Sequence, residues 1–420
     1  MAQNTPEAVA AQNAAMKAQL AHVTTLVEEY CNLSASLAGK ELTIAEHGTQ
    51  SGIHTTVVQE AHKLLHAIKG PVDTLFCHFE NVAHTGAVRA LLEMGMFNAL
   101  PQDGSSKTAE ALSIELKAEK ELIIRLMRMA TVWGPFKEVG VEEYAHTPDS
   151  LVYLVPQLNG IFKLLVDEYQ CAELLFYKFF RENGWNNPIQ DRNNPYTYSM
   201  RTEGKNMWEY MAQFPDRMNS FNYAMQAQSS AASWAVGLYP FREVFSQLET
   251  TDETPLVVDI GGGKGHTISQ IKGYTGEGIK GRFILQERRI VLDDITEELP
   301  GIEREEYNFF TPQPIKNAVV YYLRRIFHDW PEAVCVEILR NIAAGITDKT
   351  RQRVVIADDI LPEKGADAEG AWMDLTMMTL TGTERTEKQW RKLLDDAGFK
   401  LTRTFVGPGT NYAAVEAFLK

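Results

Sequence analysis

Short apolar runs alternate with amphipathic stretches in the second half of the chain. From Pro255 onward the runs have the length of strands, and the stretches between them have the spacing of helices. This alternation is typical of β-α-β units, which build a parallel sheet. The sequence therefore predicts an α/β fold with a doubly wound sheet. The predicted strands are Leu256–Ile260, Arg282–Gln286, Ala318–Leu323, Val354–Asp358 and a run near Tyr412–Phe418.

The first hundred residues have the periodicity of helices instead. Ala, Leu and Val recur at helical spacing through residues 1–45. The polar stretch Glu46–Gly52 predicts a loop, and Thr55–Leu100 predicts further helix. Within that helical region, Ala87–Leu100 carries apolar residues at intervals of three and four. Such a stripe indicates an amphipathic helix with one face against a core.

The next segment has the order of a winged-helix module. Two helices, Thr108–Glu115 and Ala118–Trp133, follow the helix that ends at Leu100, and Phe136–Thr147 predicts a small β-hairpin. Winged-helix modules often bind DNA, but that function needs a basic face. The second of these helices has no net basic face, which favours an interaction or scaffold role. Its charged residues include Glu119, Glu121, Arg125 and Arg128.

The length of the chain suggests two domains. Residues 150–250 are helical and rich in aromatic residues, with a polar break at Glu182–Asn194. Such a segment can cover a cleft, although most of its aromatic residues are expected to be core. A chain of 420 residues is long enough for two domains. We place a helical domain at residues 1–240 and the α/β domain at residues 241–420.

The first predicted strand ends in a glycine-rich turn, Asp259-Ile-Gly-Gly-Gly-Lys-Gly-His266. Glycine tolerates positive φ and has no Cβ, so this backbone can pass close to a nucleoside ligand. An ordinary glycine-rich turn between strand and helix is the alternative. The dinucleotide fingerprint needs glycine where His266 stands, and the Walker spacing is absent. The remaining common user of this turn is the S-adenosylmethionine-dependent methyltransferase, whose cationic or hydroxyl-bearing ligand would suit the Asp259 carboxylate.

Two more polar residues follow strand ends. Glu287 comes 28 residues after Asp259, at the place where an open α/β sheet holds a ribose. A solvated glutamate before Arg288 and Arg289 is the alternative. His328 lies just past the third strand, beside Asp329. An imidazole with an unperturbed pKa near 6.5 is neutral at physiological pH and can take a proton from a phenol.

Acids from the next segments can orient that histidine. Asp358 ends the fourth strand, and Asp359 is an equally polar neighbour that the sequence does not exclude. Glu384 lies in the segment Thr381–Glu387. A carboxylate on the far imidazole nitrogen fixes the tautomer and stabilises the imidazolium. The alternative for Glu384 is an acid near a helix N-terminus, where it would interact with the helix dipole.

Composition narrows the class of protein. Hydrophobic residues make up 45% and charged residues 23% of the chain, as in ordinary soluble proteins. The net charge of −14 argues against nucleic-acid and anionic membrane partners. The N-terminal segment has no apolar core typical of a secretory signal, and no run of 18 apolar residues occurs. The four separated cysteines have no metal-ligand spacing. We therefore expect a cytoplasmic enzyme without a metal.

Three motifs together resemble the plant and fungal small-molecule O-methyltransferases of the caffeic-acid type. The resemblance covers roughly residues 85–420 and implies a Rossmann-like methyltransferase sheet in the S-adenosylmethionine-binding catalytic domain. It also implies a homodimer formed through an N-terminal helical domain that contains the winged-helix segment. The motifs are Val258-Asp-Ile-Gly-Gly-Gly-Lys-Gly265, His328-Asp-Trp-Pro331 and Gly382-Thr-Glu-Arg-Thr386.

The resemblance also implies roles for individual residues. His328 matches the general base, and Asp358 and Glu384 match the two acids beside it. Four residues match positions around the acceptor: Phe221, Met225, Asp329 and Met377. Seven match positions around the cofactor: Asp259, Gly261, Gly263, Glu287, Asn308, Phe309 and Arg324.

The chain departs from the usual family pattern in several places. Glu287 and Asn308 stand where the family usually has aspartate, and Arg288–Arg289 replaces a Leu-Pro pair. Arg324 stands where plant members have a lysine, and Asp358 stands where glutamate is common. The changes at 287 and 308 affect the expected cofactor contacts, whereas Asp358 has a shorter reach toward His328.

The expected reaction is in-line transfer of a methyl group to a hydroxyl of an aromatic or polyketide-like secondary metabolite. Positioning should supply most of the rate gain, and a general base typically adds about 10²–10⁴-fold. The alternative is a protein that binds S-adenosylmethionine but catalyses dehydration or pericyclic cyclisation. Such a protein is expected to lack the base histidine, so the presence of His328 favours methyl transfer.

Overall fold

The computed structural model describes residues 5–420, apart from the side chains of residues 229–231. The chain forms two compact units, and neither is continuous in sequence. The first contains Met1–His62, Glu182–Pro195 and Ala231–Lys420, and the second contains Lys63–Arg181 and Tyr196–Ser230. The predicted division into a helical domain at residues 1–240 and a catalytic domain at residues 241–420 stays a prediction.

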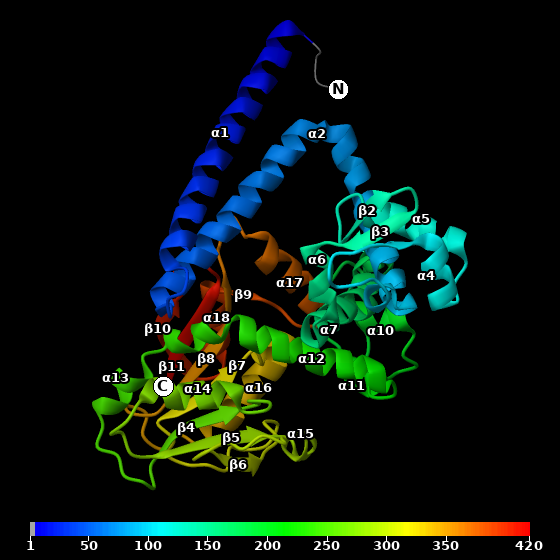
Figure 1. Ribbon diagram of the computed structural model, residues 1–420. Coiled ribbons are helices and arrows are strands. Elements are labelled where there is room, and N and C mark those ends of the chain that lie inside the picture. The colour runs from blue at the N-terminus through cyan, green and yellow to red at the C-terminus, as the bar shows by residue number, and fades with distance from the viewer. Residues whose placement is uncertain (1–4) are drawn as a thin grey trace. The chain divides into compact units, whose positions relative to one another are not determined.

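The first unit is built on a mixed sheet of eight strands (Figure 1). Its strand order is β10-β11-β8-β7-β4-β5-β6, and β9 pairs with β8. The neighbours from β6 to β8 are parallel, whereas β11 is antiparallel to both β8 and β10. The strands are β4 (Pro255–Ile260), β5 (Arg282–Glu287), β6 (Glu303–Glu306), β7 (Val320–Arg324), β8 (Arg353–Leu361), β9 (Arg385–Thr386), β10 (Phe399–Val406) and β11 (Tyr412–Leu419).

The strand order reverses at β4. The chain runs from β4 to β5 and β6 on one side, then returns to β7 and β8 on the other. In open α/β sheets, ligands bind outside the carboxyl ends of strands at such a switch point. The glycine turn after β4 and the histidine after β7 both lie at this edge, which makes it the candidate site.

Helices cover both faces of the sheet and bury its apolar side chains. One core cluster joins the sheet to α16 (Glu332–Ala343) and α18 (Glu387–Asp396), and the other joins it to α13 (Phe241–Ser246) and α14 (His266–Thr275). Neighbours on β4, Val257 and Val258, belong to different clusters because successive side chains point to opposite faces. The strand is therefore apolar on both faces as far as Asp259. The other helices here are α15 (Arg289–Asp293) and α17 (Ala368–Met378).

All five predicted strands are present, but two longer strands were missed. The missed strand β6, Glu303-Arg-Glu-Glu306, is almost wholly charged and lies at one edge of the sheet. The missed β10 lies at the other edge, where Lys400 and Arg403 are exposed. An edge strand pairs with only one other strand and has one edge exposed to solvent, so it needs no continuous apolar run.

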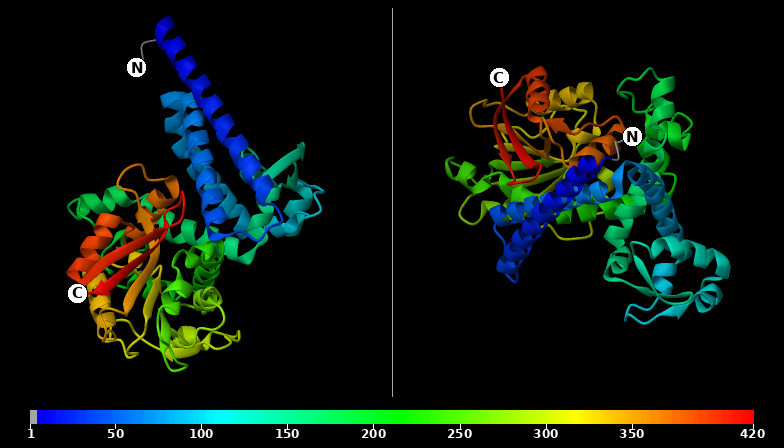
Figure 2. Two further views of the ribbon diagram at one scale, coloured as in Figure 1. Left: turned by 90° about the vertical axis from the view of Figure 1, so that its left-hand side faces the viewer. Right: turned by 90° about the horizontal axis from the view of Figure 1, so that it is seen from above.

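Two long helices begin the chain, α1 (Pro6–Leu37) and α2 (Ile44–Met94). Figures 1 and 2 show α1 beside the first part of α2, where Gln19 Nε2 donates to Glu60 Oε2 at 2.7 Å. The backbone of α2 leaves helical geometry at Gly70, which has φ 72° and is followed by Pro71.

The predicted loop at Glu46–Gly52 was wrong, because this stretch lies inside α2. Thr43 and Glu46 cap the helix start reciprocally: each side chain accepts from the other residue's backbone N–H, at 2.9 and 3.3 Å. A Cβ on Gly48 would lie 2.7 Å from Pro408 Cδ, and one on Gly52 would lie 2.7 Å from the Gly409 Cα. These glycines therefore permit close packing of a helix and do not mark a turn.

The second unit contains the predicted order of helices and hairpin. A small antiparallel sheet has the order β1-β3-β2, formed by β1 (Lys107–Thr108), β2 (Phe136–Gly140) and β3 (Glu143–His146). Its likeness to a winged-helix module stays a prediction. The helices are α3 (Met96–Ala99), α4 (Ala109–Leu116), α5 (Lys120–Ala130), α6 (Pro148–Leu151), α7 (Pro156–Leu164), α8 (Cys171–Glu173), α9 (Phe176–Glu182), α10 (Pro195–Met200), α11 (Met207–Met211) and α12 (Pro215–Ala231).

Among the described residues, no helix combines the length and the apolar character needed to cross a bilayer.

Candidate active site

The turn after β4 leaves room for a ligand. Gly261 and Gly263 have φ of 71° and 58°, a left-handed conformation that side chains other than glycine rarely adopt. A Cβ on Gly261 would lie 2.7 Å from Ile326 Cδ1, so glycine is needed for close contact with the segment after β7. A Cβ on Gly263 would meet no atom within 4 Å. The turn therefore packs tightly on one side and faces open space at Gly263.

Asp259, at the end of β4, is a fully buried carboxyl group that lacks hydrogen-bond donors. Neither of its oxygens has a hydrogen-bond partner among the described residues. Burial raises its pKa to about 7, although the nearby Arg324 opposes the change. Leaving a buried polar group unpaired costs free energy. A ligand that brings an ammonium group or a hydroxyl would satisfy it.

Glu287 ends β5 beside the same turn. The backbone N–H of Arg288 donates to Glu287 Oε2 at 2.5 Å. Burial raises the pKa of Glu287, while the N–H groups of Arg288 and Gly263 lower it. Arg289 points away from this group and pairs with Asp293 at 3.0 Å, one helical turn later. The structure therefore places the Glu287 carboxyl group close to Gly263 at the switch point.

The other predicted cofactor residues differ in their surroundings. Asn308 is exposed, and its Oδ1 accepts from the backbone N–H of Phe310 at 3.1 Å. Phe309 is half-buried and packs edge-on against Trp330. Arg324 donates to Thr267 Oγ1 at 3.3 Å and to the Ala232 carbonyl oxygen at 3.0 Å. The Arg324 guanidinium group is thus partly committed to contacts within the protein.

His328 lies in a single turn of 3₁₀ helix, Phe327–Asp329, directly after β7. Its Nδ1 is 2.8 Å from Glu384 Oε1 and 3.9 Å from Asp358 Oδ1. Its Nε2 is 3.6 Å from Asp329 Oδ1. The His328 side chain is 12% exposed, whereas those of Glu384 and Asp358 are 1% exposed. The structure therefore brings together all three predicted catalytic residues, with Glu384 in direct contact.

The expectation of an imidazole that is already neutral at physiological pH needs correction. Burial lowers the pKa of His328, but Asp329, Glu384 and Asp358 outweigh burial and raise it to about 10. The sequence named these three acids but did not show how close to the ring they lie, so it suggested the unperturbed value. His328 must therefore lose a proton before it can act as a base.

The structure also separates Asp358 from Asp359. Successive residues of a strand point to opposite faces, and only one of the two can point toward the histidine. Burial raises the pKa of Asp358 to about 7, and His328 is the strongest opposing charge. For Asp359, burial raises the pKa to about 6, and Arg325 is the strongest opposing charge. Asp358 is thus the residue beside His328.

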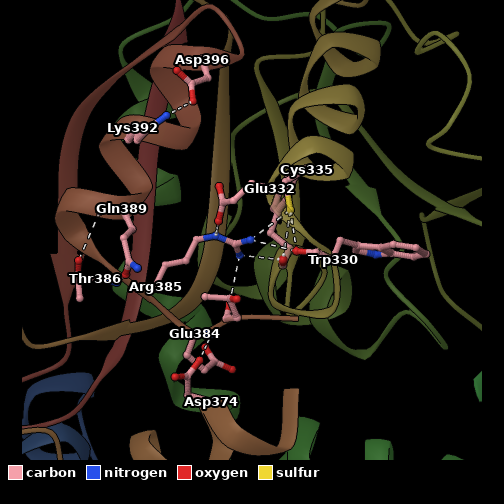
Figure 3. A network of polar contacts seen from close by, with 12 residues as sticks. Trp330, Glu332, Cys335, Asp374, Glu384, Arg385, Thr386, Gln389, Lys392 and Asp396 are labelled. Carbon is pink, nitrogen blue, oxygen red and sulfur yellow. Dashed lines mark hydrogen bonds and ion pairs between the residues drawn. The ribbon is translucent and has the colours of Figure 1, made fainter. Parts of the chain in front are cut away.

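Glu384 is held in place from its backbone. Its N–H donates to Asp374 Oδ1 on α17 at 2.9 Å, as Figure 3 shows. The helix α18 begins later, at Glu387, and Thr386 caps it by accepting from Gln389 N at 3.4 Å. Glu384 therefore precedes the helix and contacts His328, which disfavours the alternative of an acid in the first helical turn.

The predicted acceptor residues lie in both units. Met377 is buried on α17, and its Cβ lies close to the Gly382 backbone. Asp329 is next to His328. Phe221 and Met225 lie on α12 in the second unit, where Phe221 packs edge-on against Trp208 at 5.2 Å between ring centres. The roles of these four residues stay predictions.

Two residues near His328 were missed from the sequence, Asp374 and Arg385. Arg385 is fully buried and belongs to the motif Gly382–Thr386. The sequence did not indicate its burial, because an arginine between polar residues is usually exposed. Asp374 lies four residues before the end of α17, and nothing in the sequence marks it as a site residue.

Among the described residues, no group of three or more histidine, cysteine or acidic side chains could hold a metal ion.

Comparisons with known proteins agree with this arrangement. A family model described as the O-methyltransferase domain matches residues 185–400. The chain is 46% identical to O-methyltransferase opaF of Aspergillus ustus, over 100% of both chains.

Solved structures extend the likeness to the fold. The crystal structure of OxaC in complex with SAH and oxaline is 33% identical, covers 96% of this chain and 100% of its own, and has a TM-score of 0.81. A structure described as a pericyclic reaction enzyme is 24% identical over 95% of this chain and 99% of its own, with a TM-score of 0.77, and shows the fold alone. The predicted Rossmann-like methyltransferase sheet with an N-terminal helical region is confirmed.

Proposed function

Because the chain belongs to the family of S-adenosylmethionine-dependent small-molecule O-methyltransferases, we propose that His328 is the general base of its methyl transfer. The cofactor supplies an electrophilic methyl group on a sulfonium. The observation that carries the proposal is the 2.8 Å contact between His328 Nδ1 and Glu384 Oε1 at the ligand-binding edge of the sheet. This contact leaves Nε2 as the nitrogen that can face an acceptor hydroxyl.

The proposed roles of the residues follow from their geometry. Glu384 accepts a hydrogen bond from the Nδ1–H of His328, which fixes the tautomer and stabilises the ring when it becomes charged. His328 first releases the proton on Nε2, and that nitrogen then accepts the proton of the acceptor hydroxyl. Asp358 is buried beside the pair and adds negative charge near the imidazolium. The acceptor oxygen is thereby made nucleophilic where the methyl group is delivered.

We propose that the turn after β4 and the strand ends hold the cofactor. The unpaired Asp259 carboxyl group would accept from the cofactor amine, and Glu287 would accept from the ribose hydroxyls. The open space at Gly263 would let the backbone approach the ligand closely. Asn308 and Phe309 would flank the adenine, and the remaining donors of Arg324 would face the adenosine.

For the acceptor, we propose a flat aromatic or polyketide-like molecule with a free hydroxyl. Aromatic and methionine side chains favour flat, polarisable ligands. Phe221, Met225 and Met377 supply such side chains, and Asp329 supplies a polar group beside His328 Nε2.

We also propose a homodimer that uses α2. Apolar side chains on this helix are exposed at intervals of three and four residues, which is the pattern of a helix face that packs against a partner. A second copy of the chain would cover this face. After the break at Gly70 the residues of this face are Val72, Leu75, Phe76, Phe79 and Val82, and Leu65 and Ile68 are exposed before the break.

A cytoplasmic location without nucleic-acid or membrane partners completes the proposal. The net charge of −14 supports the absence of nucleic-acid and membrane partners, since nucleic acids and anionic membranes both attract basic surfaces. All four cysteines are free thiols, and Cys31 and Cys171 are exposed. Exposed free thiols are typical of a reducing compartment.

The test is transfer of isotopically labelled methyl from S-adenosylmethionine to phenolic and polyketide candidates, read by mass spectrometry. Wild type and His328→Ala would run beside His62→Ala, which removes an exposed histidine from α2. We expect His328→Ala to lower kcat by about 10²–10⁴-fold. Binding of S-adenosylhomocysteine should stay within about twofold, because the proposed base does not hold the cofactor. His62→Ala should match wild type.

Two outcomes would overturn the proposal. A kcat of His328→Ala equal to that of wild type would show that another group removes the proton. Cofactor binding without label transfer, together with conversion of a substrate to an isomer or a dehydrated product, would favour the non-methylating alternative.

A further inference from the structure

Arg385 follows Glu384 in the chain and has no exposed surface. Its guanidinium group has five N–H donors in a fixed planar arrangement, and the structure offers five acceptors. The acceptors are Glu332 Oε1 at 2.8 Å from Nε, the carbonyl oxygens of Phe327 at 2.8 Å and Thr383 at 3.3 Å from Nη1, and the Trp330 carbonyl oxygen at 3.0 Å and Cys335 Sγ at 3.4 Å from Nη2 (Figure 3).

These acceptors bracket the candidate base. Phe327 precedes His328 in the 3₁₀ turn, and Trp330 lies two residues after it. Thr383 precedes Glu384, so one guanidinium group binds both the segment of the histidine and the segment of its carboxylate partner. A direct backbone contact adds to this link, since Thr383 N donates to the His328 carbonyl oxygen at 2.9 Å.

The position of Arg385 is set independently of these carbonyl groups. Its guanidinium lies 5.2 Å from the ring centre of Trp390, a buried residue of the first core cluster. Arg385 is also the first residue of β9, where it pairs with Ile360 near the end of β8. The guanidinium group is therefore fixed against the core, and its hydrogen bonds to Phe327 and Trp330 hold the turn that carries His328.

We propose that Arg385 is a positioning residue for the methyl transfer: it fixes the 3₁₀ turn of His328 against the segment of Glu384. The proposal rests on the proposed role of His328 as the base. A lysine would keep the charge but would replace five directed donors with one ammonium group. The prediction is therefore that geometry, and not charge alone, sets the contribution of Arg385.

The competing explanation is that Arg385 only stabilises the fold. Removing Arg385 alone takes a donor from the carbonyl oxygens of Phe327, Thr383 and Trp330, and is expected to cost stability. Turnover of the folded protein and its melting temperature are measured separately, so loss of positioning and loss of stability are separable. Under the purely structural explanation, a variant that folds and binds cofactor keeps its turnover number. Under our proposal, turnover falls in a folded protein, and the loss disappears when His328 is absent.

The experiment compares Arg385→Met, Arg385→Lys and Glu332→Gln, each alone and in the His328→Ala background. Glu332→Gln is the matched control, because it removes only the outer ion pair and the Glu332 side chain is 59% exposed. Measurements are kcat, KM for both substrates, the melting temperature, and calorimetric binding of S-adenosylhomocysteine. Guanidinium chloride at low millimolar concentration is added to Arg385→Met as a rescue test.

We expect Arg385→Met to lower kcat by about 10–100-fold, which does not exceed the about 10²–10⁴-fold that a general base contributes because the base is displaced and not removed. KM and cofactor binding should stay within about twofold. Arg385→Lys should retain at most about a tenth of the wild-type kcat, and Glu332→Gln should stay within about twofold of wild type. In the His328→Ala background, both Arg385 variants should have no further effect, because residues that act as a unit are not additive. Guanidinium should restore part of the kcat of Arg385→Met.

Three results would overturn the inference. The first is a folded, cofactor-binding Arg385 variant with kcat within about twofold of wild type. The second is a kcat of the Arg385→Met, His328→Ala double variant that is lowered by the product of the two single effects, while His328→Ala alone is impaired. That result would refute the positioning role of Arg385 but not the role of His328 as the base. The third is an unimpaired His328→Ala, which would refute the base assignment and this inference together. If Arg385→Met does not fold, Arg385→Lys and its double variant decide the question.

Discussion

At the scale of single residues, the site is dominated by one imidazole among three carboxyl groups. A histidine in an apolar pocket would have a lowered pKa, because burial disfavours the charged form. Here Asp329, Glu384 and Asp358 outweigh that effect and raise the pKa of His328. The carboxyl groups favour the charged imidazolium, the form that the proposed base would reach on taking a proton. They also make the free base scarce at neutral pH, so activity should increase as the pH rises.

A Glu384→Gln variant tests this balance. Glutamine keeps the shape and an amide oxygen that can accept the Nδ1 proton, but it removes one negative charge. The pKa of His328 should then fall, so the rise of kcat/KM with pH should move to lower pH. The plateau should be lower, because the imidazolium is less stabilised. The measurement is kcat/KM from about pH 6 to pH 10.

The control for that profile is Glu387→Gln in α18, which pairs with Arg391 away from the histidine. Its profile should superimpose on that of wild type. A rise that stays in place or moves to higher pH in Glu384→Gln would contradict the electrostatic explanation.

At the scale of elements, the segment between α17 and β9 decides where Glu384 lies. Thr381 has φ 84°, a conformation that a β-branched residue rarely adopts. A Cβ on Gly382 would lie 2.1 Å from the His328 carbonyl oxygen, so this backbone touches the backbone of the 3₁₀ turn. Strain at a non-glycine residue persists only where the surroundings impose it. The tight packing here holds the acid and the histidine at a fixed distance.

A Gly382→Ala variant should therefore lower both stability and turnover. The added methyl group forces the two backbones apart, and overpacking of this kind costs about 1–3 kcal/mol. The matched control is Gly273→Ala in α14, where a Cβ would meet no atom within 4 Å. That change should stabilise the protein by about 0.5–1 kcal/mol, since alanine is favoured over glycine inside a helix.

The free energy of unfolding in urea and kcat are measured for Gly382→Ala and Gly273→Ala. Equal stability of Gly382→Ala and wild type, or an unchanged kcat in a destabilised Gly382→Ala, would show that this contact does not set the site geometry.

At the scale of the whole molecule, the sheet of the first unit is covered on both faces, whereas α2 leaves apolar side chains exposed. The two core clusters bury both faces of the sheet. In contrast, Phe79 and Val72 are 69% and 65% exposed. Exposed apolar side chains that repeat along one helix mark an interaction surface. This contrast supports assembly of two copies through α2.

A Phe79→Glu variant should shift the molecule from dimer to monomer. Burying a phenylalanine contributes about 1.5–3 kcal/mol, and a twofold interface loses that contribution twice. The dimer should therefore weaken by at least about 10²-fold, measured by light scattering across a concentration series. Val141→Glu is the control, because Val141 is the exposed tip residue between β2 and β3. A monomeric wild type or an unchanged mass for Phe79→Glu would refute the proposed interface.

The sequence by itself determined the central sheet and its ligand-binding edge. The strands β4, β5, β7 and β8 are apolar on both faces, and such runs are visible without neighbours. Because parallel strands align their carboxyl ends, the residues after these runs had to meet at one edge. Asp259, Glu287 and His328 could therefore be assigned to one site from their place in the chain.

Tertiary structure alone decided the chemistry of that site. Glu384 lies 56 residues after His328, and only the packed segment at Gly382 brings their side chains together. The choice between Asp358 and Asp359 depended on the register of β8, and the direction of the His328 pKa shift depended on three separate segments. The stretch Glu46–Gly52 was predicted as a loop because the sequence does not show the chain that packs against Gly48 and Gly52. Local spacing specifies elements, but distances between charges and backbones arise only when distant segments pack.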